Sequence, residues 1–267
     1  GVGMPGVAYK AKVLPVRVLG KCGGYLSDIA DAVVWASGGT VAGIPANTNP
    51  AEIINMSLGG GGACASTYQD AINGAISRGT TVVVAAGNQA ADAVNYSPAS
   101  CRNVITVGAT GIGGRIASYS NYGSNVALAA PGGDPDSSAG ISQGYVWSTG
   151  NEGATVAGRD ILVGMVGTSM AAPHVAGIVA LMQSASVGAD RGALSPGQVR
   201  QLLVDSARPF PIAPPADRPI GAGLADAAGA VQLALGNPLP EPPIPGLQNG
   251  VLSSGLGGAA AQSFAYQ

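Results

Sequence analysis

The 267-residue sequence is poor in charge, and this scarcity excludes two classes of partner. Charged residues make up 10% of the chain, the formal net charge is −2, and no basic run occurs. Nucleic-acid binding and electrostatic docking to a membrane both need clustered positive charge, so we expect neither. No uninterrupted apolar run approaches the roughly 18 residues of a transmembrane helix, so we predict no membrane span.

Cysteine is also scarce, and the odd number of three leaves two interpretations open. In an oxidising compartment, one disulfide and one remaining cysteine is the simplest arrangement. We favour a disulfide between Cys64 and Cys101, because both lie in loops beside predicted strands. Cys22 then bonds to a cysteine outside this chain or stays a free thiol. The alternative is three reduced, buried thiols in a cytosolic protein.

What the sequence does contain is an alternation of strand and helix patterns. Short apolar or β-branched runs predict strands, and apolar residues at helical spacing predict helices. The predicted strands are 11–19, 53–58, 80–86, 104–109 and 126–130. The predicted helices begin near residues 26, 67, 168, 195 and 224. This order predicts an α/β fold with a mainly parallel sheet flanked by helices. Residues 118–125 are interpreted as a turn-rich surface segment, and 132–160 as a long loop with room for short strands.

Composition divides the chain into three parts. Residues 1–236 are expected to form one large domain. Residues 237–245 are rich in proline, which is typical of a semi-rigid linker. Residues 246–267 are too few for a domain. Their stretch 247–258 resembles the opening of the bacterial pre-peptidase C-terminal β-domain, so we expect either a truncated start of such a domain or a disordered tail.

A serine at the start of a predicted helix is the main candidate for chemistry. Ser169 lies in the string Gly-Thr-Ser-Met-Ala-Ala-Pro-His-Val-Ala-Gly, residues 167–177. Unpaired amides and the helix dipole favour negative charge at a helix N-terminus, as the oxyanion of an acyl transfer requires. The alternative is an ordinary Ser or Thr N-cap on a core helix. Loops 57–60 and 85–88 follow two other predicted strands, so we expect them at the same sheet edge as Ser169.

Three strings carry a resemblance to the subtilisin-like serine peptidases, the subtilases. They are Asn-Met-Ser-Leu-Gly-Gly at 55–60, Ala-Ala-Gly-Asn at 85–88 and the Ser169 string, in the order of that family. The resemblance covers about residues 3–235. It implies a subtilisin-like three-layer fold, an extracellular serine endopeptidase of the secreted bacterial type, Ser169 as the nucleophile and Asn88 as a donor to the oxyanion.

The resemblance also implies how a peptide substrate is held. Gly23 and Gly24 on one side, and Ser57, Leu58 and Gly59 on the other, are expected to flank an extended peptide. Ala85, Ala86 and Gly87 are expected to form a wall of the pocket for the residue before the scissile bond, and Thr168 is counted with the substrate-binding residues. Small, uncharged walls predict a roomy apolar pocket with broad preference. For each glycine the alternative is a turn that requires positive φ.

The general base is missing from this sequence. The single histidine, His174, lies five residues after Ser169, roughly 140° around the same helix, so it cannot accept the serine proton. The resemblance places the catalytic Asp and His in an upstream segment absent from this chain. We therefore expect an N-terminal companion fragment of the same precursor, linked through Cys22 or held by packing, and no turnover by this chain alone.

Two further expectations complete the sequence-based interpretation. The chemistry needs no cofactor, whereas structural Ca²⁺ is expected because members of the family often bind it; no ligand can be assigned in this chain. The alternative function is a non-catalytic, subtilase-like scaffold or binding module that lacks its general base.

Overall fold

Four parallel strands form the centre of the molecule. The computed structural model describes residues 5–135 and 144–239. In the described part the sheet order is β1-β3-β5-β6, and every pairing in it is parallel. The strands are β1 (Ile53–Met56), β3 (Thr81–Ala85), β5 (Ile105–Thr110) and β6 (Val126–Pro131). All residues of β3 and β5 are buried, as expected for runs of apolar and β-branched residues covered on both faces.

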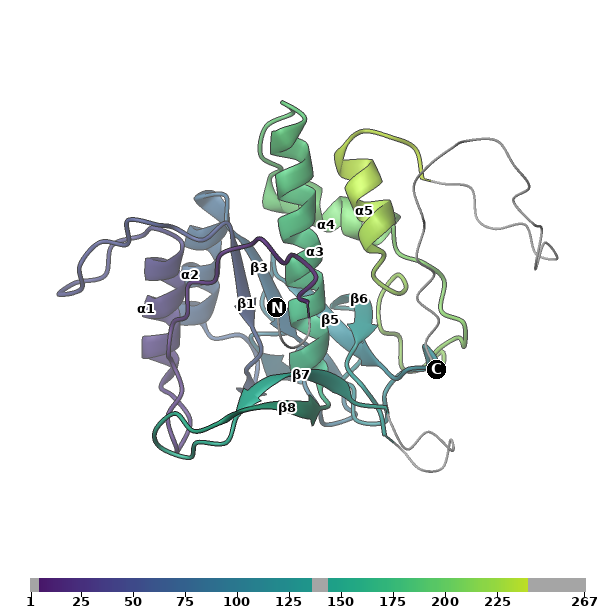
Figure 1. Cartoon of the computed structure of the whole chain (residues 1–267), viewed down its shortest axis with the longest axis horizontal. Coiled ribbons are helices and arrows are strands. Elements are labelled where there is room, and N and C mark those ends of the chain that lie inside the picture. Colours follow the sequence, from purple (N-terminus) through teal and green to yellow (C-terminus); the bar gives the residue numbers. More distant parts are fainter. Residues whose placement is uncertain (1–4, 136–143, 240–267) are drawn as a thin grey trace.

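Helices cover both faces of this sheet and make three layers (Figure 1). Val82 and Val84 of β3 pack with residues of α1 and α2, whereas Val83 and Ala85 pack with residues of α3, α4 and α5. The helices are α1 (Leu26–Ala36), α2 (Ser66–Ser77), α3 (Thr168–Gly188), α4 (Pro196–Asp205) and α5 (Ala227–Ala234). The predicted α/β fold with a mainly parallel sheet is therefore confirmed.

Helix α3 lies against the sheet for most of its length. It is the one described helix long and apolar enough to cross a membrane by length and composition, although Ser, His, Pro and Gln interrupt its apolar residues. Its side chains at Val175, Val179 and Met182 are fully buried in the core beside β3 and β5. A core helix of a folded domain meets the same criteria of length and composition, and here the burial accounts for the apolar sequence.

The predicted strand 11–19 is absent from the structure. The segment is irregular, and its apolar side chains are exposed, Val13 by 85% and Leu19 by 44%. No described strand pairs with it, and the outer edge of β1 is likewise unpaired within the described residues. An apolar run becomes a strand only where a neighbour supplies hydrogen bonds, so the sequence pattern alone was insufficient here.

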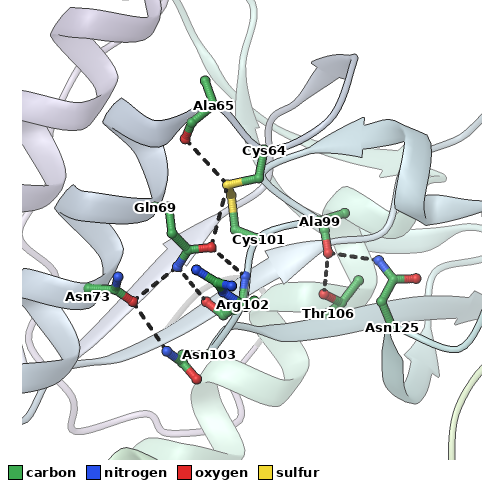
Figure 2. Close-up of a disulfide and its surroundings, with 10 residues drawn as sticks. All are labelled: Cys64, Ala65, Gln69, Asn73, Ala99, Cys101, Arg102, Asn103, Thr106 and Asn125. Atoms are coloured by element: carbon green, nitrogen blue, oxygen red, sulfur yellow. Dashed lines mark hydrogen bonds between the residues drawn. A yellow bond between two sulfur atoms is a disulfide. The ribbon is translucent and has the colours of Figure 1, made fainter.

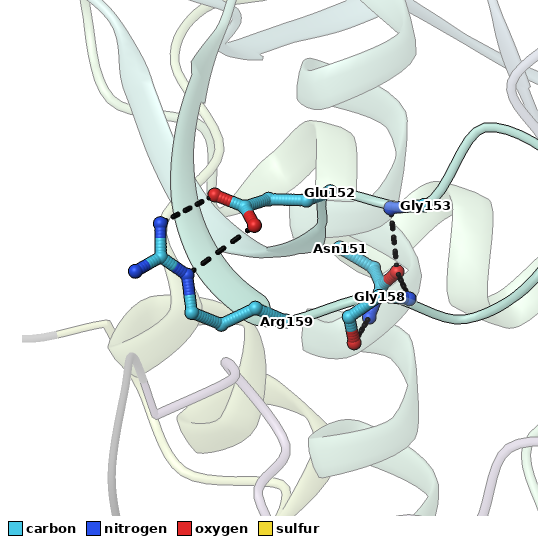
Figure 3. Close-up of polar contacts among 5 residues, drawn as sticks. All are labelled: Asn151, Glu152, Gly153, Gly158 and Arg159. Carbon is cyan, nitrogen blue, oxygen red and sulfur yellow. Dashed lines mark hydrogen bonds and ion pairs between the residues drawn. The ribbon is translucent and has the colours of Figure 1, made fainter.

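The predicted loop 132–160 contains most of a β-hairpin. Strands β7 (Val146–Asn151) and β8 (Asp160–Met165) pair antiparallel at the N-terminal end of α3 (Figure 1). At the hairpin tip, the Asn151 side chain accepts hydrogen bonds from the amides of Gly153 and Gly158, and Arg159 pairs with Glu152 at 2.6 Å (Figure 3). Residues 136–143 lie outside the described part, as do residues 240–267, which include most of the predicted linker and the whole predicted tail.

The predicted disulfide is present. Cys64 and Cys101 are bonded, with Cα atoms 5.0 Å apart, and they link the start of α2 to the segment before β5 (Figure 2). Gln69 of α2 reinforces this link, because its side chain bonds to both the amide and the carbonyl of Arg102. Cys22 is an exposed free thiol. The alternative of three reduced, buried thiols is therefore wrong.

Candidate active site

Ser169 is the second residue of α3 and does not cap it. The N-cap is Gly167, which has φ +148°, a value that disfavours any residue with a Cβ. Ser57, beyond the end of β1, holds the helix start, since its hydroxyl donates to the carbonyl of Ser169 at 2.8 Å. Asn55 in turn donates to the Ser57 hydroxyl at 3.0 Å. The alternative interpretation of Ser169 as an N-cap is thus wrong, and its hydroxyl instead donates to the carbonyl of Ser57 at 3.4 Å.

Asn88, in the loop after β3, is fixed by Thr168. Its side-chain oxygen accepts hydrogen bonds from the amide and from the hydroxyl of Thr168, both at 2.9 Å. The same hydroxyl accepts the amide of Gly87 at 3.1 Å. With the oxygen bound on one side, the Asn88 amide nitrogen Nδ2 points away from Thr168 and is free to donate.

Two N–H donors converge on one small volume next to Gly167. A Cβ added to Gly167 would lie 3.4 Å from Nδ2 of Asn88, 3.6 Å from the backbone nitrogen of Ser169 and 3.7 Å from Oδ1 of Asn88, which accepts from Thr168. Only glycine leaves that volume open. An oxygen atom placed there would meet a side-chain amide and the amide of the second residue of α3, at the positive end of the helix. This volume is therefore the candidate position for an oxyanion.

A cavity of about 240 Å³ opens beside Ser169. It is lined by Leu58, Gly59, Gly60, Ala85, Ala86, Gly87, Asn88, Gln89, Tyr96, Ser97, Ala99, Thr168 and Ser169. No lining residue carries a charge, and small side chains dominate the walls. Thr168 borders the cavity, but its residue is fully buried and its hydroxyl bonds are internal, so the structure gives it a positioning contact.

Some residues of the cavity have no counterpart in the sequence-based prediction. Tyr96 and Ser97 form β4 (Tyr96–Ser97), which pairs antiparallel with β2 (Gly60–Gly61) to close one side. Two-residue strands leave no periodic signal, so only the fold shows this contact. Gly23 and Gly24, by contrast, were predicted to flank the substrate but do not line the cavity beside Ser169. They line a separate cavity of about 470 Å³ with Val18, Cys22 and Tyr25.

Asn121 shapes the loop that carries Asn88. The residue is fully buried, its side-chain oxygen accepts the amides of Gln89 and Ala91, and its side-chain nitrogen donates to the carbonyl of Ala86. A Cβ on Gly87 would lie 2.2 Å from that nitrogen, and φ of Gly87 is +108°. The interpretation of 118–125 as a surface segment was therefore wrong at Asn121. Its polar side chain is buried because it makes hydrogen bonds to backbone groups of the loop that carries Asn88.

His174 is engaged within its own helix. Its Nδ1 lies 2.8 Å from the carbonyl oxygen of Met170, one turn earlier in α3. This contact holds the ring along the helix, and the described residues contain no other histidine. They also contain no cluster of three His, Cys, Asp or Glu side chains that could hold a metal ion. The structure thus brings Ser169, Thr168 and Asn88 together, while the His174 ring is bonded within α3.

A three-layer α/β fold thus carries Ser169 near the start of a core helix, beside an uncharged cavity. Residues 1–235 match the family described as "Subtilase family", Peptidase_S8. The chain belongs to the subtilase family, and with it to the serine peptidases.

Individual relatives agree with this assignment. An "Extracellular protease" of Xanthomonas campestris pv. campestris is 52% identical over 99% of this chain and 43% of its own length. An "Extracellular basic protease" of Dichelobacter nodosus is 44% identical over 91% of this chain and 39% of its own. A solved protease structure from Pseudoalteromonas arctica superposes with a TM-score of 0.79 at 52% identity, covering 86% of this chain and 65% of that one. This chain spans less than half the length of these two curated relatives.

Proposed function

We propose that this chain is the serine-bearing part of an extracellular endopeptidase that cleaves peptide bonds through an acyl-enzyme on Ser169. The observation that carries the proposal is the convergence of Asn88 Nδ2 and the Ser169 amide on the volume beside Gly167. The relatives named as extracellular proteases and the disulfide, which persists in oxidising compartments, support secretion.

In the proposed reaction, Ser169 Oγ attacks the carbonyl carbon of the scissile bond and its proton passes to a histidine of the companion segment. The carbonyl oxygen becomes an oxyanion, and Asn88 Nδ2 and the Ser169 amide stabilise it. Collapse returns the carbonyl, breaks the C–N bond and passes the proton to the leaving amine. Water then hydrolyses the ester by the same steps.

An extended peptide is the proposed substrate. Residues 57–59 and the walls at Ala85, Ala86 and Gly87 offer backbone groups and a small apolar pocket for the residue before the scissile bond. Because no charged side chain lines that pocket, the proposed preference is broad and apolar. Gly23 and Gly24 are proposed to contact a more distant part of the peptide, since they line a different cavity.

The catalytic Asp and His are proposed to come from a companion segment of the same precursor. Three features of the chain support this: its single histidine is bonded to Met170, the outer edge of β1 is unpaired among the described residues, and apolar side chains of 11–19 are exposed. A companion strand would satisfy that edge and cover those side chains. The exposed thiol of Cys22 is available for a disulfide to it. Structural Ca²⁺ remains a prediction, and the described side chains offer no cluster for it.

An organofluorophosphonate tests the nucleophile directly. With the companion segment present, we expect the reagent to label Ser169 stoichiometrically, and we expect Ser169→Ala to abolish the label. Thr67→Ala, at an exposed position in the first turn of α2, serves as the matched hydroxyl control and should label normally. Absence of labelling in the folded complex would contradict the peptidase and favour the non-catalytic scaffold, whose sequence would contain the same lone histidine.

A further inference from the structure

The two oxyanion donors lie on separate elements, and something must fix the distance between them. Asn88 follows β3, whereas Ser169 begins α3, 81 positions later in the printed sequence. Thr168 joins them directly, but the Asn88 loop and the glycine turn before Ser169 also need a common support. Tyr119, in the segment between β5 and β6, contacts the supports of both.

The backbone of Tyr119 holds the Asn88 loop. Its carbonyl accepts the amide of Ala90 at 2.8 Å, two residues after Asn88. Asn121, two residues further along, accepts the amides of Gln89 and Ala91 and donates its own amide to Gly87. The segment 119–121 therefore makes hydrogen bonds to the loop on both sides of Asn88.

The side chain of Tyr119 reaches in the other direction, toward the turn before Ser169. Its hydroxyl donates to the carbonyl of Gly132 at 2.8 Å and also contacts the carbonyl of Gly133. The carbonyl of Gly132 accepts the amide of Gly167 at 2.9 Å as well. A Cβ on Gly132 would lie 2.8 Å from the Gly167 carbonyl and 3.0 Å from the Tyr119 hydroxyl, so the three groups pack without free space.

Tyr119 keeps its proton in this environment. Burial raises the pKa of its hydroxyl well above the ordinary 10.0, the neighbouring Gly167 backbone partly opposes this increase, and the charge of Asp134 adds a smaller one. The hydroxyl is thus a neutral donor at any pH at which a peptidase works. It lies close to Gly167 but is not placed to touch a reacting atom.

We propose that Tyr119 is a positioning residue that sets the separation of the two oxyanion donors, through its carbonyl on the Asn88 loop and its hydroxyl on the Gly132–Gly167 contact. This inference rests on the proposed peptidase function. In this role Tyr119 acts as a rigid spacer. Loss of its hydroxyl is expected to leave the pocket intact but to allow the Gly167 turn to shift relative to Asn88.

The test compares Tyr119→Phe with Tyr122→Phe in the chain bound to its companion segment. Tyr122 lies three residues away, and its hydroxyl makes no hydrogen bond within the described residues, so it controls for removal of a phenolic oxygen. For a short peptide substrate, we expect Tyr119→Phe to lower kcat about 10-fold with KM changed less than twofold, the size of one lost hydrogen bond in the transition state. Tyr122→Phe should keep the wild-type kcat.

Two further readouts separate positioning from general weakening. If Tyr119 acts through the oxyanion site, its substitution should add little to Asn88→Ala in a double-mutant cycle, and a peptide boronate should bind Tyr119→Phe more weakly in proportion to the loss of kcat. Amide exchange at Gly167 should also accelerate in Tyr119→Phe, with or without catalysis.

Several results would overturn the inference while leaving the peptidase intact. These are wild-type kcat in Tyr119→Phe, a fully additive double-mutant cycle, or unchanged exchange at Gly167. Failure of the fluorophosphonate to label the wild-type complex would instead reject the peptidase, and exchange at Gly167 would then decide the spacer role alone.

Discussion

At the scale of single residues, Thr168 sets the orientation of Asn88, the proposed oxyanion donor. Its hydroxyl donates to Asn88 and accepts from Gly87, and its amide also donates to Asn88. The residue is fully buried. A change at Thr168 therefore disturbs the geometry of Asn88 and also removes the hydrogen-bond partner of the half-buried Gly87 amide.

Thr168→Val is expected to lower kcat by about 10- to 100-fold, with little change in KM, because Asn88 keeps only one of its two anchoring bonds. The upper limit stays below the 100- to 1,000-fold loss seen when the corresponding amide donor is removed from subtilisin itself, a magnitude taken from that enzyme. Loss of the Gly87 hydrogen bond should cost about 0.5–1.5 kcal/mol of unfolding free energy, since this half-buried amide borders the cavity. Steady-state kinetics and urea unfolding measure the two effects.

Thr168→Ser is the matched control, since it keeps the hydroxyl and removes only a methyl group. We expect it to retain kcat within a few-fold of the wild type. A Val variant as active as the Ser variant would show that the Thr168 hydroxyl does not position Asn88.

At the scale of elements, the sequence predicted a helix or strand correctly wherever the local residue pattern agrees with the packing of that segment in the fold. The run at 80–86 is β-branched and became the buried strand β3, and the helix predicted near 195 begins with a complete capping box between Ser195 and Gln198. The loop predicted over 132–160, with room for short strands, contains β7 and the start of β8, but their pairing was not predicted because it depends on contacts beyond the local sequence. Residues 11–19 were wrongly predicted to form a strand, because the run is apolar but no described strand pairs with it.

The residues of the candidate site likewise fall into those that the sequence predicted and those that only the fold shows. Ser169, Asn88 and the walls at 85–87 lie in sequence strings that a resemblance can identify. Tyr96, Ser97 and Asn121 lie in no such string, and they reach the site only through contacts that the folded chain creates. A polar residue such as Asn121 gives no signal of burial until its distant hydrogen-bond partners are known.

The disulfide is the element-scale feature with the clearest expected effect on stability. It closes a loop of 37 residues' separation that contains α2, β3, the Asn88 loop and β4. Replacing both cysteines, Cys64→Ala with Cys101→Ala, should lower the free energy of unfolding by about 2–4 kcal/mol, because the unfolded chain regains the entropy of the open loop. Denaturant unfolding of the two proteins measures the difference.

Cys22→Ala is the control for this experiment, since its thiol is exposed and unbonded in the described structure. It should unfold with the wild-type midpoint in the isolated chain. An unchanged midpoint in the Cys64/Cys101 double variant would mean that the disulfide constrains a segment already ordered in the unfolded state.

At the scale of the whole molecule, one added segment could complete both the proposed active site and the sheet edge at β1. The proposed reaction needs a base and an orienting carboxylate, and the outer edge of β1, unpaired among the described residues, can accept a further strand. One added segment can meet both needs if its strand lies beside β1, because the carboxyl end of that strand would then reach the same sheet edge as Ser169. The exposed apolar side chains of 11–19 lie ready to pack against it.

The purified chain alone is therefore expected to show no peptide turnover, and addition of the companion segment should restore it. Restoration should follow binding, so that the amides of β1 and the apolar side chains of 11–19 become protected over the same concentration range, as hydrogen exchange and limited proteolysis would report. Ser169→Ala should bind the companion equally well and gain the same protection without turnover. Turnover by the chain alone, with mass spectrometry excluding any companion, would mean that the proton is taken by a group other than a companion histidine. Since His174 is bonded to Met170 on the same helix, that result would also require α3 to rearrange around its only imidazole.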